Sequence, residues 1–138
     1  MRDYRGKNKI TGEWVFGDLR NYERTGAKAI FSHVLLHRVE VDPETVGQYS
    51  GIFTKDEVED GDALCTFIYE GDIVEPVLTE GTHGGFSWGR QVVVFDHGAF
   101  CLKDRRGQTT PMCNYSASVK FKVLGNVHDN PELLEVKE

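Results

Sequence analysis

Short segments in which apolar and polar residues alternate are the feature that most constrains this fold. Within Ser118–Leu124, Val119, Phe121 and Val123 fall on one face and the lysines on the other, which is the pattern of a half-buried strand. The run Gln91–Phe95 is apolar on both faces and rich in valine, which favours a central strand. A chain with this period of two is expected to fold mainly as β-sheet.

Glycine marks the turns between these segments. Asp96-His97-Gly98 separates Gln91–Phe95 from the apolar run Ala99–Leu102, which predicts a hairpin with a three-residue loop in which Gly98 takes a positive φ. Glu70-Gly71-Asp72 also lies between two apolar runs. No histidine, lysine or metal ligand is near it in sequence, so it is interpreted as a turn entering a strand and not as a catalytic carboxylate pair.

The remaining elements are short. Further strands are predicted at Trp14–Phe16, Ala29–Phe31, Val34–Val41 and Thr45–Tyr49. At the end of the chain, Asn130 as N-cap, Pro131 at the first helical position and Glu132 in the first turn predict a short C-terminal helix. We therefore expect a mainly β fold in one unit of residues 1–138, in which residues of about 69–138 form a small SH3-like or open barrel. The N-terminal strands of residues 1–50 are expected to pack on it.

Length, net charge and the absence of long apolar runs limit the classes of function that the chain can have. A length of 138 residues suits one domain, and a net charge of −6 argues against holding nucleic acid by non-specific phosphate contacts. The cluster of Lys103, Arg105 and Arg106 is interpreted as a solvated hairpin tip. Every apolar run is far shorter than the ~20 residues that span a bilayer, and no apolar segment follows the basic N-terminus, so a cytoplasmic protein is expected.

The candidate metal ligands do not form a site in sequence. Cys65, Cys101 and Cys113 are odd in number and show no CxxC spacing, so buried, reduced thiols are expected. His33 and His37 lie in a segment that looks extended, where residues four apart stand ~13 Å from each other. The acidic run of residues 56–62 lacks the ligands that a calcium loop has at its third and twelfth positions. No metal and no cofactor are predicted.

Phe86, Trp88 and Arg90 form the most site-like feature of the sequence. Alternate residues of a strand project together, and a Phe-Trp-Arg row can stack a base, a ring or a peptide side chain. The other interpretation is an aromatic row that closes one end of the barrel. The glycine-rich stretch 81–89 lacks the ending of a phosphate-binding loop. No Ser-His-Asp or Cys-His arrangement is evident, so no catalytic residues and no enzymatic activity are predicted.

Five segments, in order, resemble the YopX family of bacteriophage and prophage proteins. They are Gly12–Leu19, Glu44–Gly51, Tyr69–Val74, Val93–Phe95 with Gly98–Phe100, and Val123–Leu134. The resemblance implies a phage or integrated-phage origin, a mainly β fold and an uncharacterised role, and it brings no catalytic residue with it. Phe53–Ile68 departs from the family, because this segment is longer and more acidic than the family's usual short turn.

Two classes of function follow from these observations. The first is a non-enzymatic protein-binding or assembly module that engages a phage or host protein through Phe86, Trp88 and Arg90. The alternative is a nucleic-acid-associated protein, either a single-strand binder that uses the same row or an acidic DNA mimic that uses Asp56–Asp62. Unpaired strand edges also favour a homo-oligomer.

Overall fold

The described residues of the chain fold mainly as antiparallel β-strands, as expected. A computed structural model describes residues 3–57, 63–78, 85–116 and 118–135. The chain divides into two compact units, Met1–Tyr49 and Ser50–Glu138, which we call the N-terminal and C-terminal units and describe separately. The expected organisation as one YopX-like unit of residues 1–138 stays a prediction.

The N-terminal unit is an antiparallel sheet with the strand order β4-β3-β2-β1. Its elements are β1 (Tyr4–Lys7), β2 (Trp14–Asn21), β3 (Lys28–Ser32), β4 (His37–Val41) and the 3-10 helix η1 (Pro43–Thr45). The strand β5 (Gly47–Glu57) begins here and pairs with β1 at Gly47 and Gln48. The buried core consists of Val15, Ile30, Val39 and Val41.

Gly17 lets β2 and β3 approach each other closely. It lies opposite Ser32 in the register of these strands and has a φ of +157°. A Cβ atom built there would lie 2.9 Å from the carbonyl carbon of Phe31 and 3.2 Å from Cγ2 of Ile30, and it would overlap the Phe31 carbonyl oxygen. The sheet of the N-terminal unit therefore requires a residue without a side chain at this position.

The strand predicted at Val34–Val41 is too long, because its first three residues belong to a turn and the strand begins only at His37. Residues 33–36 form the turn of the β3–β4 hairpin, and β4 begins at His37. The backbone N–H of Leu36 donates to the carbonyl oxygen of Ser32 at 2.8 Å, and that of Leu35 donates to Ser32 Oγ at 3.0 Å. Leu36 has a φ of +60° and is 74% exposed. The apolar residues of this segment therefore face solvent and not a sheet core.

The second strand of this region also begins later than predicted. Thr45 lies in η1, and β5 starts at Gly47. Thr45 accepts a hydrogen bond from the backbone N–H of Lys7 at 2.8 Å and donates one to the carbonyl oxygen of Asp42 at 2.6 Å. Its hydroxyl thus links η1 to β1 and stabilises a turn, although a β-branched residue such as threonine by itself favours a strand.

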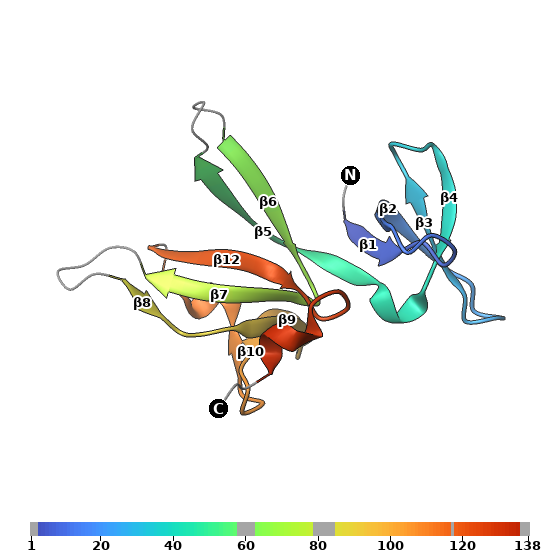
Figure 1. The fold of residues 1–138 in the computed structure, drawn as a ribbon. Coiled ribbons are helices and arrows are strands. Elements are labelled where there is room, and N and C mark those ends of the chain that lie inside the picture. The colour runs from blue at the N-terminus through green and yellow to red at the C-terminus, as the bar shows by residue number, and fades with distance from the viewer. Residues whose placement is uncertain (1–2, 58–62, 79–84, 117, 136–138) are drawn as a thin grey trace. The chain divides into compact units, whose positions relative to one another are not determined.

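The C-terminal unit is built on a curled sheet with the order β11-β10-β9-β7-β12, and β8 pairs with β7 (Figure 1). Its strands are β6 (Ala63–Tyr69), β7 (Asp72–Leu78), β8 (Phe86–Ser87), β9 (Gln91–Asp96), β10 (Ala99–Lys103), β11 (Thr109–Pro111) and β12 (Val119–Asn126), and its 3-10 helices are η2 (Met112–Asn114) and η3 (Pro131–Leu134). The strand β6 lies next to β5. The central place of β9 is confirmed, and the SH3-like barrel stays a prediction.

The core of this unit gathers side chains from β6, β7, β9, β10 and η2. Its buried members are Ile68, Val74, Val93, Leu102 and Met112. Partly buried side chains of Ile52, Phe100, Tyr115, Phe121 and Val123 pack against it. The apolar cluster of the C-terminal unit therefore shares no residue with that of the N-terminal unit.

The Glu70-Gly71-Asp72 triplet is a turn, as predicted. It carries the chain from β6 into β7, and Gly71 has a φ of +93°. The Asp72 carboxylate is buried and accepts a hydrogen bond from the backbone N–H of Tyr69 at 2.8 Å. This carboxylate thus caps the turn from inside the fold.

The β9–β10 hairpin has a two-residue loop, not the three-residue loop that was predicted. Asp96 pairs with Ala99, and His97 and Gly98 have φ values of 50° and 80°. Two successive residues with positive φ are typical of a type I′ turn, which matches the twist of the flanking strands. The positive φ of Gly98 is confirmed.

Replacing Gly98 by valine is expected to lower the free energy of unfolding by about 1–2 kcal/mol, because a β-branched residue is strained at positive φ. No other atom lies within 4 Å of a Cβ built at Gly98, so the loss reports backbone strain alone. Gly98→Asn is the matched control, since asparagine tolerates this conformation. Urea unfolding of the parent chain and of the two variants measures the free energies of unfolding. Equal values for the parent and Gly98→Val would show that valine is not strained at this position.

The predicted Asn130 cap is wrong, and the predicted C-terminal helix is not confirmed. Pro131–Leu134 forms a single 3-10 turn, and the Asn130 side chain makes no capping hydrogen bond to it. Oδ1 of Asn130 instead accepts a hydrogen bond from the backbone N–H of Asn126 at 3.3 Å. The side chain therefore closes the preceding turn, where it also lies against Gly125.

All three cysteines are free thiols, but only Cys101 is buried; Cys65 and Cys113 are exposed, in contrast to the prediction. Burial raises the pKa of Cys101, and the nearby Asp96 carboxylate and Cys113 raise it further. Among the described residues, no group of three or more His, Cys, Asp and Glu side chains is placed to hold a metal ion. In the same residues, no helix is long and apolar enough to cross a membrane.

Candidate functional site

Trp88 is held at the surface of the C-terminal unit by two other aromatic rings. Its ring centroid lies 4.9 Å from that of Phe86 and 5.5 Å from that of Tyr115, both in edge-to-face geometry. Tyr115 makes the same type of contact with Phe121 at 5.5 Å. Trp88 remains 41% exposed. A large apolar side chain is thus fixed in place but left accessible.

The backbone around Trp88 is also fixed. Its N–H donates to the carbonyl oxygen of Pro76 on β7 at 3.1 Å, and its own carbonyl oxygen accepts from Nε2 of Gln91 at 3.3 Å. Ser87 Oγ donates to Oε1 of Glu75 at 2.9 Å and accepts from the N–H of Gly89 at 3.0 Å. These bonds tie the segment between β8 and β9 to the neighbouring strand.

Arg90 reaches the same region as Trp88, although the three predicted residues do not form a row on one strand. The strand β8 ends at Ser87, and Gly89 has a φ of +80°. Trp88 and Arg90 nevertheless both line one hollow of about 430 Å³, whereas Phe86 contacts Trp88 without lining it. Nη1 of Arg90 donates to the carbonyl oxygen of Leu133 at 3.1 Å, which points the guanidinium towards η3.

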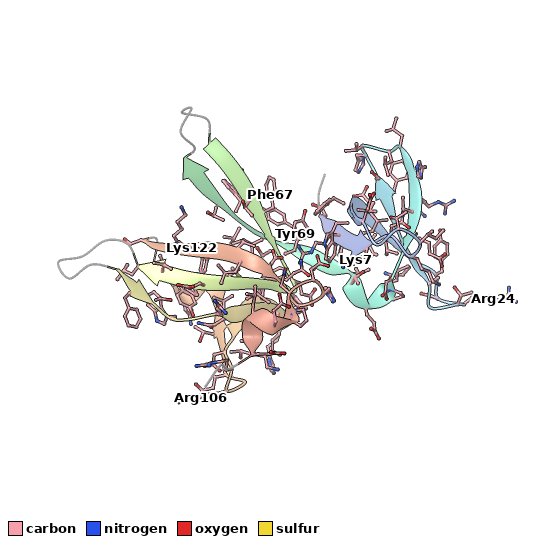
Figure 2. All side chains as sticks on the ribbon, in the orientation of Figure 1. Lys7, Arg24, Phe67, Tyr69, Arg106 and Lys122 are labelled. Atoms are coloured by element: carbon pink, nitrogen blue, oxygen red, sulfur yellow. The ribbon has the colours of Figure 1, made fainter. Side chains whose placement is uncertain are left out.

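The β10–β11 hairpin supplies the other wall of this hollow. Arg105, Arg106 and Gln108 line it together with Asp104. The Asp104 carboxylate accepts from the backbone N–H groups of Arg106 and Gln108 at 2.9 and 3.0 Å. It therefore shapes the turn that presents the arginines, and Figure 2 shows Arg106 at the tip of this hairpin. The tip is exposed, as predicted.

A second hollow of about 490 Å³ has several of the same lining residues. It is lined by Arg90, Val92, Val94, Lys103, Asp104, Arg105 and Leu134. Counting only the described residues, four basic and two acidic side chains line the two hollows, the acidic ones being those of Asp104 and Glu135. We call these two hollows and their lining residues the Trp88 site. It combines one fixed aromatic ring with a surplus of positive charge.

The Trp88 site offers two kinds of non-covalent contact. Arginine offers planar, bidentate hydrogen bonds to carboxylates and phosphates, and tryptophan offers a large apolar face. Among the residues that the structure describes, the lining of this site includes no histidine, serine or cysteine that could act as an activated nucleophile. The prediction that the chain is not an enzyme stays a prediction, as does the absence of a cofactor.

Sequence reasoning missed the part of the Trp88 site that comes from elsewhere in the chain. Tyr115, the hairpin tip and η3 are distant from Trp88 in sequence, and the sheet order brings them together. The signal in the sequence is the cluster of Lys103, Arg105 and Arg106, which by itself gives no indication that it lies close to Trp88. The acidic run of Asp56–Asp62, proposed as a DNA mimic, has side chains outside the described residues.

Comparisons with known proteins place the chain in one family. The model of a family described as "YopX protein" matches residues 3–135. The crystal structure of protein yopX from Bacillus subtilis is similar over 96% of this chain and 98% of that one, with a TM-score of 0.53 and 20% sequence identity. At that identity the likeness concerns the fold alone. No curated protein matches the sequence.

Proposed function

The chain belongs to the YopX protein family, and from that premise we propose that it is a non-enzymatic module that binds a phage or host protein through the Trp88 site. The observation that carries the proposal is the partial exposure of Trp88, whose ring is held by Phe86 and Tyr115 beside Arg90. Protein interfaces draw most of their binding energy from a few such tryptophan and arginine residues.

Fixing the ring in advance favours tight binding. A side chain that is already held loses little conformational freedom when a partner covers it. Trp88 contacts aromatic rings on two sides, and its backbone is bonded to Pro76 and Gln91. A partner can therefore bury the remaining exposed surface of Trp88 without first having to order it.

The charges around Trp88 define the chemistry of the partner. Arg90, Lys103, Arg105 and Arg106 favour a segment that carries carboxylates around an apolar anchor. Because these cations are at or near the surface, the association rate is expected to fall as salt is added. The partner that we propose is thus an acidic segment of another protein.

A single-stranded nucleic acid is the second candidate for the same site. The convergence of Arg90, Arg105 and Arg106 on an exposed tryptophan supports it, because base stacking and phosphate contacts use these side chains. The net charge of −6 opposes it. Protein binding is therefore placed first.

Trp88→Ala and Arg90→Ala are each expected to weaken capture of the partner at least tenfold, since interface anchors of this kind are worth about 2 kcal/mol or more. Tagged protein is exposed to lysate of phage-infected and uninfected host cells, and the captured proteins are quantified by mass spectrometry. Phe95→Ala and Arg24→Ala are matched controls, because they remove an exposed aromatic ring and an exposed cation that do not line the Trp88 site.

The outcome separates the two candidates. Loss of one captured protein in the two site variants, with retention in both controls, supports the proposal. Equal capture by all variants contradicts it. A gel shift with a single-stranded oligonucleotide at low salt that is abolished by Trp88→Ala would instead favour the nucleic-acid function. Thermal unfolding of each variant checks that the fold is intact.

A further inference from the structure

A separate groove of about 450 Å³ lies between β5 and β12 in the C-terminal unit. Its walls are Ile52, Phe53 and Thr54 on one side and Met112, Tyr115, Ser116, Ser118, Val119, Lys120 and Phe121 on the other. Ile52, Tyr115 and Phe121 pack on the buried core, while Phe53 is 48% exposed. The groove therefore offers apolar and polar surface side by side, is open to solvent and is backed by a packed core.

One wall of the groove is an edge strand. In the part of the chain that the structure describes, β12 pairs with β7 on one side and with no strand on the other. An edge strand presents a row of backbone N–H and C=O groups that can pair with a further strand. Figure 1 shows β12 between β7 and the β5–β6 hairpin, so its outer edge faces the groove.

Thr54 supplies an independent sign that the groove receives a ligand. The residue is only 8% exposed, and among the described residues its Oγ1 atom has no hydrogen-bond partner. A buried hydroxyl without a partner destabilises a fold. The hydroxyl oxygen itself is closed to solvent. A bound chain can therefore provide the missing bond when the packing around Thr54, which lines the groove, shifts to admit a polar group.

The lysines of β12 decide against a second copy of this chain as the occupant. Lys120 lines the groove and Lys122 is exposed on the same strand (Figure 2). Antiparallel pairing of two β12 strands about Phe121 would place Lys120 of one copy opposite Lys122 of the other. Like charges directly opposite each other destabilise a strand pair, whereas acidic side chains opposite these lysines stabilise it.

We propose that this groove binds an extended segment of a partner protein in which apolar and acidic side chains alternate. The segment adds to β12 as a further strand, its apolar side chains cover Phe121 and Phe53, and its acidic side chains face the lysines. This second docking site is distinct from the Trp88 site and does not depend on the function proposed for it. The two are linked physically, because Tyr115 contacts both Trp88 and Phe121.

The test uses fluorescein-labelled eight-residue peptides and fluorescence anisotropy with the full chain. The probe alternates valine and glutamate; one control alternates valine and lysine, and another carries two prolines in place of valines. The expected result is saturable binding of the valine-glutamate peptide and at least tenfold weaker binding of both controls. Proline is disruptive because it removes backbone donors from the added strand.

Thr54→Val is the decisive variant, because it removes the hydroxyl while keeping the shape of the side chain. The variant is expected to raise the melting temperature of the free chain, because a buried hydroxyl without a partner is removed. It is also expected to lower the affinity for the valine-glutamate peptide about tenfold. Lys122→Glu is expected to abolish the preference between the two charged peptides, because one lysine and one glutamate then face the bound strand. Arg90→Ala is expected to leave peptide binding within twofold, because Arg90 lines the Trp88 site and not this groove, and this separates the proposal from the function of the Trp88 site.

Several results would overturn the proposal. They are absence of saturable binding by the valine-glutamate peptide, equal binding of the proline control, unchanged affinity of Thr54→Val, and a charge preference that Lys122→Glu does not alter. A dimer in light scattering that Lys122→Glu strengthens would assign the groove to a second copy. Phe53→Ala is a further check that leaves the buried core intact, and it is expected to lower the affinity for the valine-glutamate peptide several-fold.

Discussion

Gly17→Ala is expected to lower the free energy of unfolding of the N-terminal unit by about 3 kcal/mol or more, because the new methyl group must displace backbone. It would overlap the carbonyl group of Phe31 and press on Ile30, which is fully buried. A carbonyl within a strand pair cannot rotate away as a long side chain can. The β2–β3 register itself has to open to admit the change.

Gly26→Ala is the matched control for this variant. Gly26 also has a positive φ, of +73°, but no other atom lies within 4 Å of a Cβ built there. Gly26→Ala is expected to lower the free energy of unfolding by about 1 kcal/mol, through backbone strain alone. Urea unfolding followed by Trp14 fluorescence in a Trp88→Phe background measures both, since the chain has two tryptophans and Trp14 lies in the N-terminal unit. Equal losses in the two variants would refute the clash.

Leu102→Ala is expected to destabilise the C-terminal unit by about 2–5 kcal/mol, the range observed when a buried leucine is truncated. Leu102 has no exposed surface and belongs to the buried cluster with Ile68, Val74, Val93 and Met112. The cluster is small and its members come from five elements, so no single neighbour can move in to fill the cavity. The effect is expected near the upper half of that range.

Leu124→Ala provides the comparison within the same unit. Leu124 is 38% exposed on β12, so its truncation is expected to change stability by less than about 1 kcal/mol. Trp88 fluorescence in a Trp14→Phe background follows urea unfolding of this unit. A loss for Leu102→Ala no larger than that for Leu124→Ala would show that the cluster does not stabilise the unit.

The strands that sequence predicted best are those in which side-chain pattern and burial agree. Gln91–Phe95 and Ser118–Leu124 lie within or next to β9 and β12, and Gly98 takes the positive φ that its hairpin requires. Prediction failed at Val34-Leu35-Leu36, where an apolar run forms a turn. That turn depends on the Ser32 hydroxyl and carbonyl and contains no glycine, so the only turn signal in the sequence is the weak one of a serine.

Local reasoning failed at Asn130 for a related reason. An N-cap motif describes which bonds a side chain can make, and Asn130 makes one with Asn126 instead. The side chain of Asn130 accepts from the N–H of Asn126 in the preceding turn, and it is therefore not used to cap the 3-10 turn that follows. The candidate site shows the same limit on a larger scale. Trp88 and Arg90 were predicted from their neighbours in sequence, whereas Tyr115 and Arg106 join them only through the tertiary fold.

The separation of the apolar residues into two clusters has a consequence for how the chain can evolve. Packing defects are repaired by residues that touch the altered side chain, and distant sites act independently. Ile30 belongs to one cluster and Leu102 to the other, and the clusters share no member. We expect substitutions that compensate a change at Ile30 to arise within residues 1–49, and those that compensate a change at Leu102 to arise within residues 50–138, so that the two segments accumulate compensating changes independently.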